Sequence, residues 1–201
     1  TKVFDNRVVT YTTATGWTYD NPEMWRSGYY YRFRAICPYI PNVSDDLTTT
    51  MIIQEFVVNA DVDNQQDLLV SEIETKETVS QYPMDGEETI GFVFNHLLTN
   101  VNFSFVKASS NSDVSVKLQD IILYRVKDRG ACTLTSEDGG SSWTTIWSTE
   151  DDQNFFMKSY GEDDGFLSTE EMTSVWDDGL LLIPQDVSNI GLYVGFNVID
   201  N

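Results

Sequence analysis

The sequence has few positive charges, one histidine, two cysteines and no long apolar run. Its 12 Lys and Arg residues are outnumbered by 32 Asp and Glu residues, which gives a formal net charge of −20. A chain this acidic is repelled by a phosphate backbone, because nucleic-acid binding depends on Lys and Arg. The shortage of cations therefore excludes nucleic acid as an expected partner, and it also argues against docking on anionic lipid through a basic face.

No apolar run approaches the ~20 residues that a membrane-spanning helix needs. The chain opens at Thr1 without an initiator methionine or a signal-peptide pattern, which we interpret as either a processed product or a trimmed recombinant product, so secretion stays open. Cys37 and Cys132 are too few for a disulfide scaffold. Their separation in sequence does not decide whether they pair, and we expect both to be free and buried. With one histidine and two cysteines, a zinc site is not expected.

The sequence is apolar enough to form a core, and its apolar residues recur at every second position in several segments. It is 41% hydrophobic and 13% aromatic, and 201 residues suit one large domain or two small ones. Apolar side chains alternate with polar ones, as in a half-buried strand. Three consecutive apolar residues, Ile121–Leu123, predict a bulge or a strand buried on both faces. Strands are expected over 29–38, 51–58, 67–70, 100–106, 114–119 and 192–198.

Breaks in this pattern suggest how the chain is divided. Pro83 and Gly86 punctuate a polar stretch over 80–88, so we predict an N-terminal domain over residues 1–85 and a C-terminal domain over 86–201. A capping box at Ser168–Glu171, followed by Met172, Val175 and Trp176 at helical spacing, predicts one or two helical turns. The fold class predicted from the residues is all-β.

No catalytic constellation is evident. His96 lies among apolar residues and is expected to be a packed, hydrogen-bonded histidine at a strand end. Acidic runs such as Asp45–Asp46 and Glu162–Asp164 are interpreted as solvated loops. The second run resembles a calcium loop weakly, because Tyr160 occupies the first ligand position. We therefore predict no catalytic, cofactor-binding or metal-binding residues, and no enzyme.

Two alternative functions stay open. Trp143 and Trp147 lie beside a Gly/Ser-rich loop and could form a sugar-stacking platform of a secreted carbohydrate-binding module, although core packing is the more common role of such residues. A secreted hydrolase would need two carboxylates facing each other across a cleft, which sequence alone does not reveal.

Five segments form a pattern along nearly the whole chain. They are Phe4–Tyr11 with Gly16–Tyr19 and Trp25, then Tyr31–Tyr39, Gln66–Ser71, Phe92–Phe103 and Leu181–Gln185. Taken together, in their order and spacing, they resemble the fimbrillin family of Bacteroidales surface fimbriae. The second segment is similar to the aromatic–x–Ala–Tyr–x–Pro strand of that family, with Ile36 and Cys37 in place of the usual residues.

This resemblance implies two tandem antiparallel β-sandwich domains, exported as a lipoprotein precursor and displayed on the outer membrane. It implies adhesion, and assembly with other fimbrial subunits by β-strand donation. It further implies receptors on host or bacterial surfaces, and no cofactor. Relative to the family pattern, the lipobox cysteine, the first strand and the last strands are missing, so both sandwiches are expected to be incomplete. An open sheet edge filled by a partner strand is the expected contact, but the strand-acceptor groove is not assigned to residues.

Overall fold

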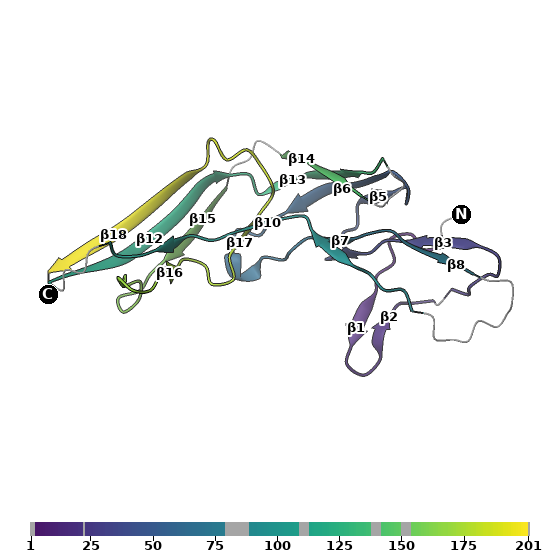
Figure 1. Cartoon of the computed structure of the whole chain (residues 1–201), viewed down its shortest axis with the longest axis horizontal. Coiled ribbons are helices and arrows are strands. Elements are labelled where there is room, and N and C mark those ends of the chain that lie inside the picture. The colour runs from purple at the N-terminus through teal and green to yellow at the C-terminus, as the bar shows by residue number, and fades with distance from the viewer. Residues whose placement is uncertain are drawn as a thin grey trace. The chain divides into compact units, whose positions relative to one another are not determined.

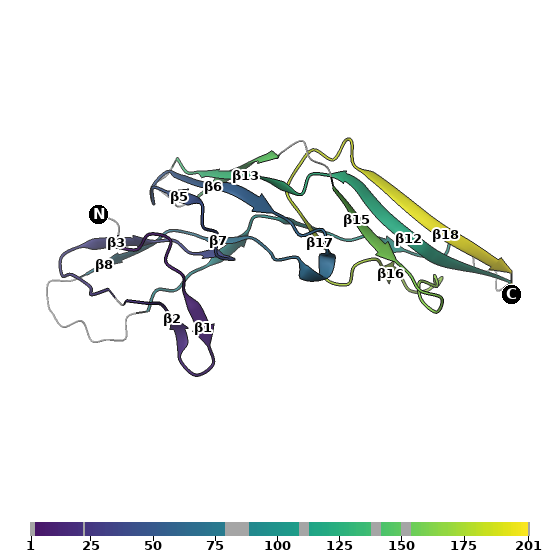
Figure 2. The same cartoon turned by 180° about the vertical axis from the view of Figure 1, so that it is seen from behind.

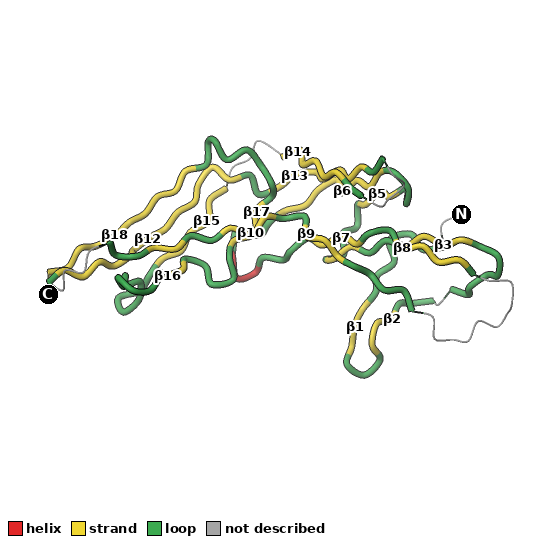
Figure 3. The backbone as a smooth tube through the Cα atoms, viewed as in Figure 1, coloured by secondary structure: helices red, strands yellow, loops and turns green. Residues whose placement is uncertain are grey.

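In the computed structural model, the chain consists mainly of β-strands joined by loops (Figure 3). The structure describes residues 3–21, 23–78, 89–108, 113–137, 142–149 and 154–200. Within these ranges the only helical segment is the 3-10 turn η1 (Val62–Asn64), where the Asp61 side chain accepts a hydrogen bond from the Asp63 N–H. None of the helices in this part of the chain is long and apolar enough to span a membrane. The all-β prediction is confirmed.

The chain divides into two compact units, each made of segments that are separate in the sequence. Unit 1 comprises residues 1–54, 68–96 and 132–146, and unit 2 comprises residues 55–67, 97–131 and 147–201. The predicted boundary at 85–86 lies outside the described residues, and the two units do not follow a single cut there. The division into two tandem sandwich domains therefore stays a prediction.

A four-stranded sheet has the order β14-β13-β6-β5. β5 pairs antiparallel with β6, with Val43 opposite Ile53. Met51 and Ile53 on β6 are buried, whereas Ile52 is exposed, as the period of two predicts. The strands are β5 (Val43–Asp45), β6 (Thr50–Val57), β13 (Arg129–Thr135) and β14 (Thr144–Thr149).

Unit 1 also contains three smaller sheets, of orders β1-β2, β3-β8 and β4-β7-β9 (Figure 1). In β3, Tyr31 and Phe33 are half-buried while Tyr30 and Arg32 are exposed, which confirms the predicted alternation. Thr78 is buried after β8, where its hydroxyl donates to the Arg26 carbonyl. The strands are β1 (Thr10–Thr12), β2 (Gly16–Thr18), β3 (Tyr30–Phe33), β4 (Ile36–Cys37), β7 (Leu69–Ser71), β8 (Glu74–Glu77) and β9 (Phe94–His96).

Unit 2 is built on a three-stranded sheet in which β12 lies between β15 and β18, as both views show (Figures 1 and 2). Leu118 pairs with Phe196 and Ile121 with Val194, so Gln119 and Asp120 together face one residue of β18. This bulge lies just before the apolar triplet that predicted one. The strands are β10 (Thr99–Val101), β11 (Ser104–Phe105), β12 (Val114–Val126), β15 (Asn154–Ser159), β16 (Thr173–Ser174), β17 (Leu180–Leu182) and β18 (Gly191–Asp200).

The predicted helix at residues 168–176 is wrong. Its cap does form, because the Ser168 Oγ accepts hydrogen bonds from the N–H groups of Glu170 and Glu171. The chain then enters β16, which pairs with β11, and the Val175 N–H donates to the Phe103 carbonyl. Pairing with a distant strand therefore overrides the local capping signal.

Candidate assembly surface

The residues that carried catalytic or metal hypotheses do not form a site. His96 ends β9 opposite Leu69, as a strand-end histidine should, but its side chain is exposed and not packed. Among the described residues, no group of three or more His, Cys, Asp or Glu side chains is placed to hold a metal ion. The acidic run Glu162–Asp164 is an exposed turn, as predicted.

Both cysteines are free, and they differ in burial. Cys132 is buried, as predicted, and this burial raises the pKa of Cys132 to about 12. The prediction that Cys37 is buried is wrong, since its side chain is exposed. The reason is its position on β4, which is an edge strand paired only with β7 in the sheet β4-β7-β9.

Arg34, Asp45 and Trp143 form a buried polar cluster in unit 1. The Arg34 Nη1 lies 3.1 Å from the Asp45 Oδ2, with side chains only 2% and 16% exposed. The Arg34 guanidinium carbon lies 3.8 Å from the centroid of the Trp143 ring. Desolvation lowers the pKa of Arg34 and raises the pKa of Asp45, against their mutual attraction. Contrary to the sequence interpretation, Asp45 is not in a solvated loop but in β5, where its side chain is 16% exposed.

This cluster also removes the predicted sugar platform. One face of the Trp143 ring is occupied by the Arg34 guanidinium. Trp147 is half-buried in unit 2, with its ring edge-on to that of Phe56 at a centroid distance of 6.5 Å. Neither indole is a freely exposed stacking surface, so the carbohydrate-binding alternative loses the feature on which it was based.

The most unusual surface of unit 2 lies on β18. Its residues Leu192, Val194, Phe196 and Val198 share one face of the strand, as the period of two predicts. Phe196 and Val198 are each 58% exposed. Leu118, the register partner of Phe196 on β12, is 1% exposed, although it belongs to the same face of the same sheet. We call the four residues and the adjoining strand edge the β18 surface.

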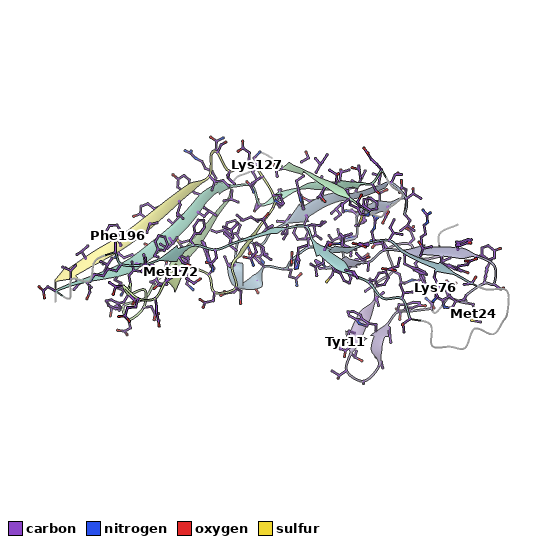
Figure 4. The ribbon with its side chains drawn as sticks, viewed as in Figure 1. Tyr11, Met24, Lys76, Lys127, Met172 and Phe196 are labelled. Atoms are coloured by element: carbon purple, nitrogen blue, oxygen red, sulfur yellow. The ribbon has the colours of Figure 1, made fainter. Side chains whose placement is uncertain are left out.

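The outer edge of β18 is open within the described residues. The strand pairs with β12 on one side, and no other described strand pairs with it. Natural edge strands are usually protected by lysine, proline, a bulge in the edge or short length. β18 has ten residues and carries no charged side chain before Asp200, and Figure 4 shows Phe196 projecting from it. The strand lacks the usual devices that prevent edge-to-edge pairing.

The other face of β18 is mixed, with Gly195 and Asn197 between Tyr193 and Ile199. Tyr193 is 54% exposed there, and Ile199 is 41% exposed. Tyr193 lies opposite Ile122 on β12, which in turn lies opposite Met157 on β15. Exposed apolar side chains therefore occur on both faces of β18, which pairs with β12 alone among the described strands.

Sequence reasoning placed the β18 strand correctly but did not identify it as a site. The alternation from Leu192 to Val198 shows which side chains share a face, but not whether anything covers that face. The one available signal was the absence of charge over residues 191–199.

Comparison with known proteins gives one match. The model of the family described as Fimbrillin-like matches residues 1–201. A search of curated proteins and a search of solved structures found no significant match.

Proposed function

The chain belongs to the fimbrillin-like family, and we propose that it is a structural subunit of a cell-surface fimbrium that accepts a β-strand from a neighbouring subunit at the β18 surface. Membership of this family points to a cell-surface fimbria and to a structural rather than catalytic role. The single observation that supports the assembly mode is the long, exposed edge strand β18, which carries no charge before Asp200.

Strand addition would pair the open backbone edge of β18 and cover its exposed apolar side chains at the same time. A neighbour's strand would pair with the N–H and C=O groups of β18 that face away from β12. Its side chains would cover Phe196 and Val198, which are now largely exposed. Covering the exposed part of each is worth about 1 to 2 kcal/mol at ~25 cal/mol per Å² of apolar surface.

The net charge of −20 adds a second element to this proposal. Like charges keep free subunits apart in solution, so that only a specific, close contact overcomes the repulsion. Salt screens such repulsion, with a Debye length of ~8 Å at physiological ionic strength. Assembly should therefore accelerate as salt is added, in contrast to association driven by opposite charges.

The proposal is tested by placing a charge on the β18 surface. Phe196→Lys should abolish the ladder of oligomers that the protein, produced and processed by its own cell, forms on a gel without heating. Met172→Lys is the matched control, since Met172 is 75% exposed in unit 2 and lies outside β18. A ladder that survives Phe196→Lys contradicts the proposed acceptor surface. A wild-type protein that stays monomeric under all processing conditions contradicts polymerisation itself.

Further parts of the proposal rest on the family alone. They are export as a lipoprotein precursor, attachment at the outer membrane, and adhesion to host or bacterial surfaces. Metabolic labelling of the producing cell with a radioactive fatty acid tests the first, because a lipoprotein incorporates the label at its processed N-terminus. Absence of label from the mature protein would contradict lipidation without affecting the strand-addition proposal.

A further inference from the structure

A cavity of about 350 Å³ lies within unit 2. Arg125 and Lys127 contribute to it from the end of β12, and Trp147 and Thr149 from β14. The loop after β17 closes it with residues 184–186 and Asn189. Figure 4 marks Lys127 beside this loop. Its volume lies at the lower end of the range for small-molecule sites, and it is sufficient for one sugar ring.

The wall of the cavity is fixed by hydrogen bonds. The Gln185 side chain accepts from the Lys127 N–H at 2.9 Å and donates to the Lys127 carbonyl at 2.8 Å. It also donates to the Ile183 carbonyl at 3.1 Å. Because this one amide joins the end of β12 to the loop after β17, the two sides of the cavity are held together. The site is thus largely preformed.

A β-bulge in β12 places the Arg125 side chain in the lining of the cavity. The register of β12 against β15 shifts between Tyr124 and Val126, and Arg125, at this shift, has a positive φ of 63°. Bulges commonly re-aim a side chain at a functional site. Within the part of the chain that the structure describes, no hydrogen bond or ion pair engages the Arg125 guanidinium, which lies 5.5 Å from the Tyr124 ring centroid. The exposed guanidinium is available to a ligand.

The charge of the lining is opposite to that of the protein. Arg125 and Lys127 supply two positive charges and Asp186 one negative charge, whereas the whole chain carries −20. Hydrogen bonds from the Ser188 N–H and hydroxyl lower the pKa of Asp186, which keeps this carboxylate ionised at neutral pH. The lining therefore favours a monoanion, while the Asp186 carboxylate repels a group with two negative charges.

We propose that this cavity binds an acidic sugar residue through its carboxylate and its hydroxyl groups. Arg125 pairs with the carboxylate, since guanidinium–carboxylate pairs are strong and directional. Asp186 accepts a hydrogen bond from a ring hydroxyl, and Thr149 and Asn189 supply further polar groups. This goes beyond the structural role proposed above, because it gives the subunit a receptor site that does not depend on strand addition.

The test is a titration of the 201-residue protein with glucuronate, glucose and inorganic phosphate, followed by NMR of the protein amides. Glucuronate should bind about tenfold or more tightly than glucose, because a hydrogen bond to a charged group contributes ~1.5 to 3 kcal/mol. Arg125→Gln should remove this preference. Lys158→Gln is the matched control, since Lys158 is exposed on β15 and does not line the cavity. It should bind glucuronate as the wild type does.

Asp186→Asn supplies an independent readout. It removes the negative charge and keeps an acceptor for the Ser188 N–H, so phosphate binding should strengthen relative to glucuronate binding. Three results would each overturn the proposal. They are equal binding of glucose and glucuronate, binding of phosphate by the wild type at least as tight as that of glucuronate, and glucuronate binding that Arg125→Gln leaves unchanged. If Arg125→Gln does not fold, the phosphate preference of Asp186→Asn decides alone. Phe196→Lys should bind glucuronate normally, which separates this site from assembly.

Discussion

β12 and β18 are neighbours in one sheet, and apolar side chains that pair across the two strands differ sharply in exposure. Leu118 on β12 is 1% exposed, and Phe196 directly opposite it on β18 is 58% exposed. Both side chains are apolar and both belong to the same face. Among the described strands, β12 has a neighbour on each side, whereas β18 pairs with β12 alone. Residue type alone therefore does not decide burial at these two paired positions.

The largest expected effect comes from truncating each member of this pair. Leu118→Ala should lower the free energy of unfolding by about 3 kcal/mol, because it removes a packed side chain and leaves a cavity. Phe196→Ala should change it by less than about 1 kcal/mol in the isolated subunit. Urea denaturation of both variants measures this. Equal losses would mean that Phe196 is already packed within the chain, which would contradict the comparison.

Much of this sheet could be predicted from the sequence. The alternation over Val114–Gln119 and Leu192–Val198 identified both strands and their faces, and Ile121–Leu123 indicated the bulge. These are local signals, since a strand's period is carried by its own residues. The exposure of Phe196 could not be predicted in this way. It depends on which strands lie alongside, and the sequence of β18 alone does not show this.

Two predictions from the sequence were wrong for the same physical reason. A helix was expected at Ser168–Trp176 because the cap is local, but pairing of β16 with β11 decides the structure. Asp45 was interpreted as a solvated loop residue, yet Arg34, eleven residues before it, forms a buried ion pair with it. In both cases the decisive partner is separate in the sequence. The candidate site was correspondingly harder to predict than the strands.

In unit 1, the buried ion pair between Arg34 and Asp45 gives a second test of how a distant partner decides the effect of burial. Asp45→Ala leaves the Arg34 charge buried without its carboxylate partner, and this should cost about 2 to 3 kcal/mol of unfolding free energy. Adding Arg34→Met should recover most of the loss, because the uncompensated charge is removed. Thermal or urea unfolding of the single and double variants tests this. A double variant no more stable than Asp45→Ala would show that the charge is not the cause.

The smallest expected effect is the contribution of Asp46 to the pH dependence of the free energy of unfolding. Although desolvation opposes it, hydrogen bonds from Thr50, Thr49 and Thr48 lower the pKa of Asp46 below its usual range. A folded-state pKa below the unfolded value stabilises the fold above the unfolded pKa, and this contribution is lost as the pH falls. Asp46→Asn should therefore be slightly less stable than the wild type at pH 7. The gap should narrow on acidification below about pH 4, and a gap that widens would contradict the assignment.

The most direct test of the account is a cross-linking measurement in assembled fimbriae. A photoreactive amino acid is placed at position 198 on the β18 surface, and at position 172 in a parallel sample as the control. The account predicts that position 198 cross-links to a strand of the neighbouring subunit, and that position 172 gives little or no such product. Fimbriae that assemble normally while position 198 cross-links to no other subunit would contradict the proposed role of β18.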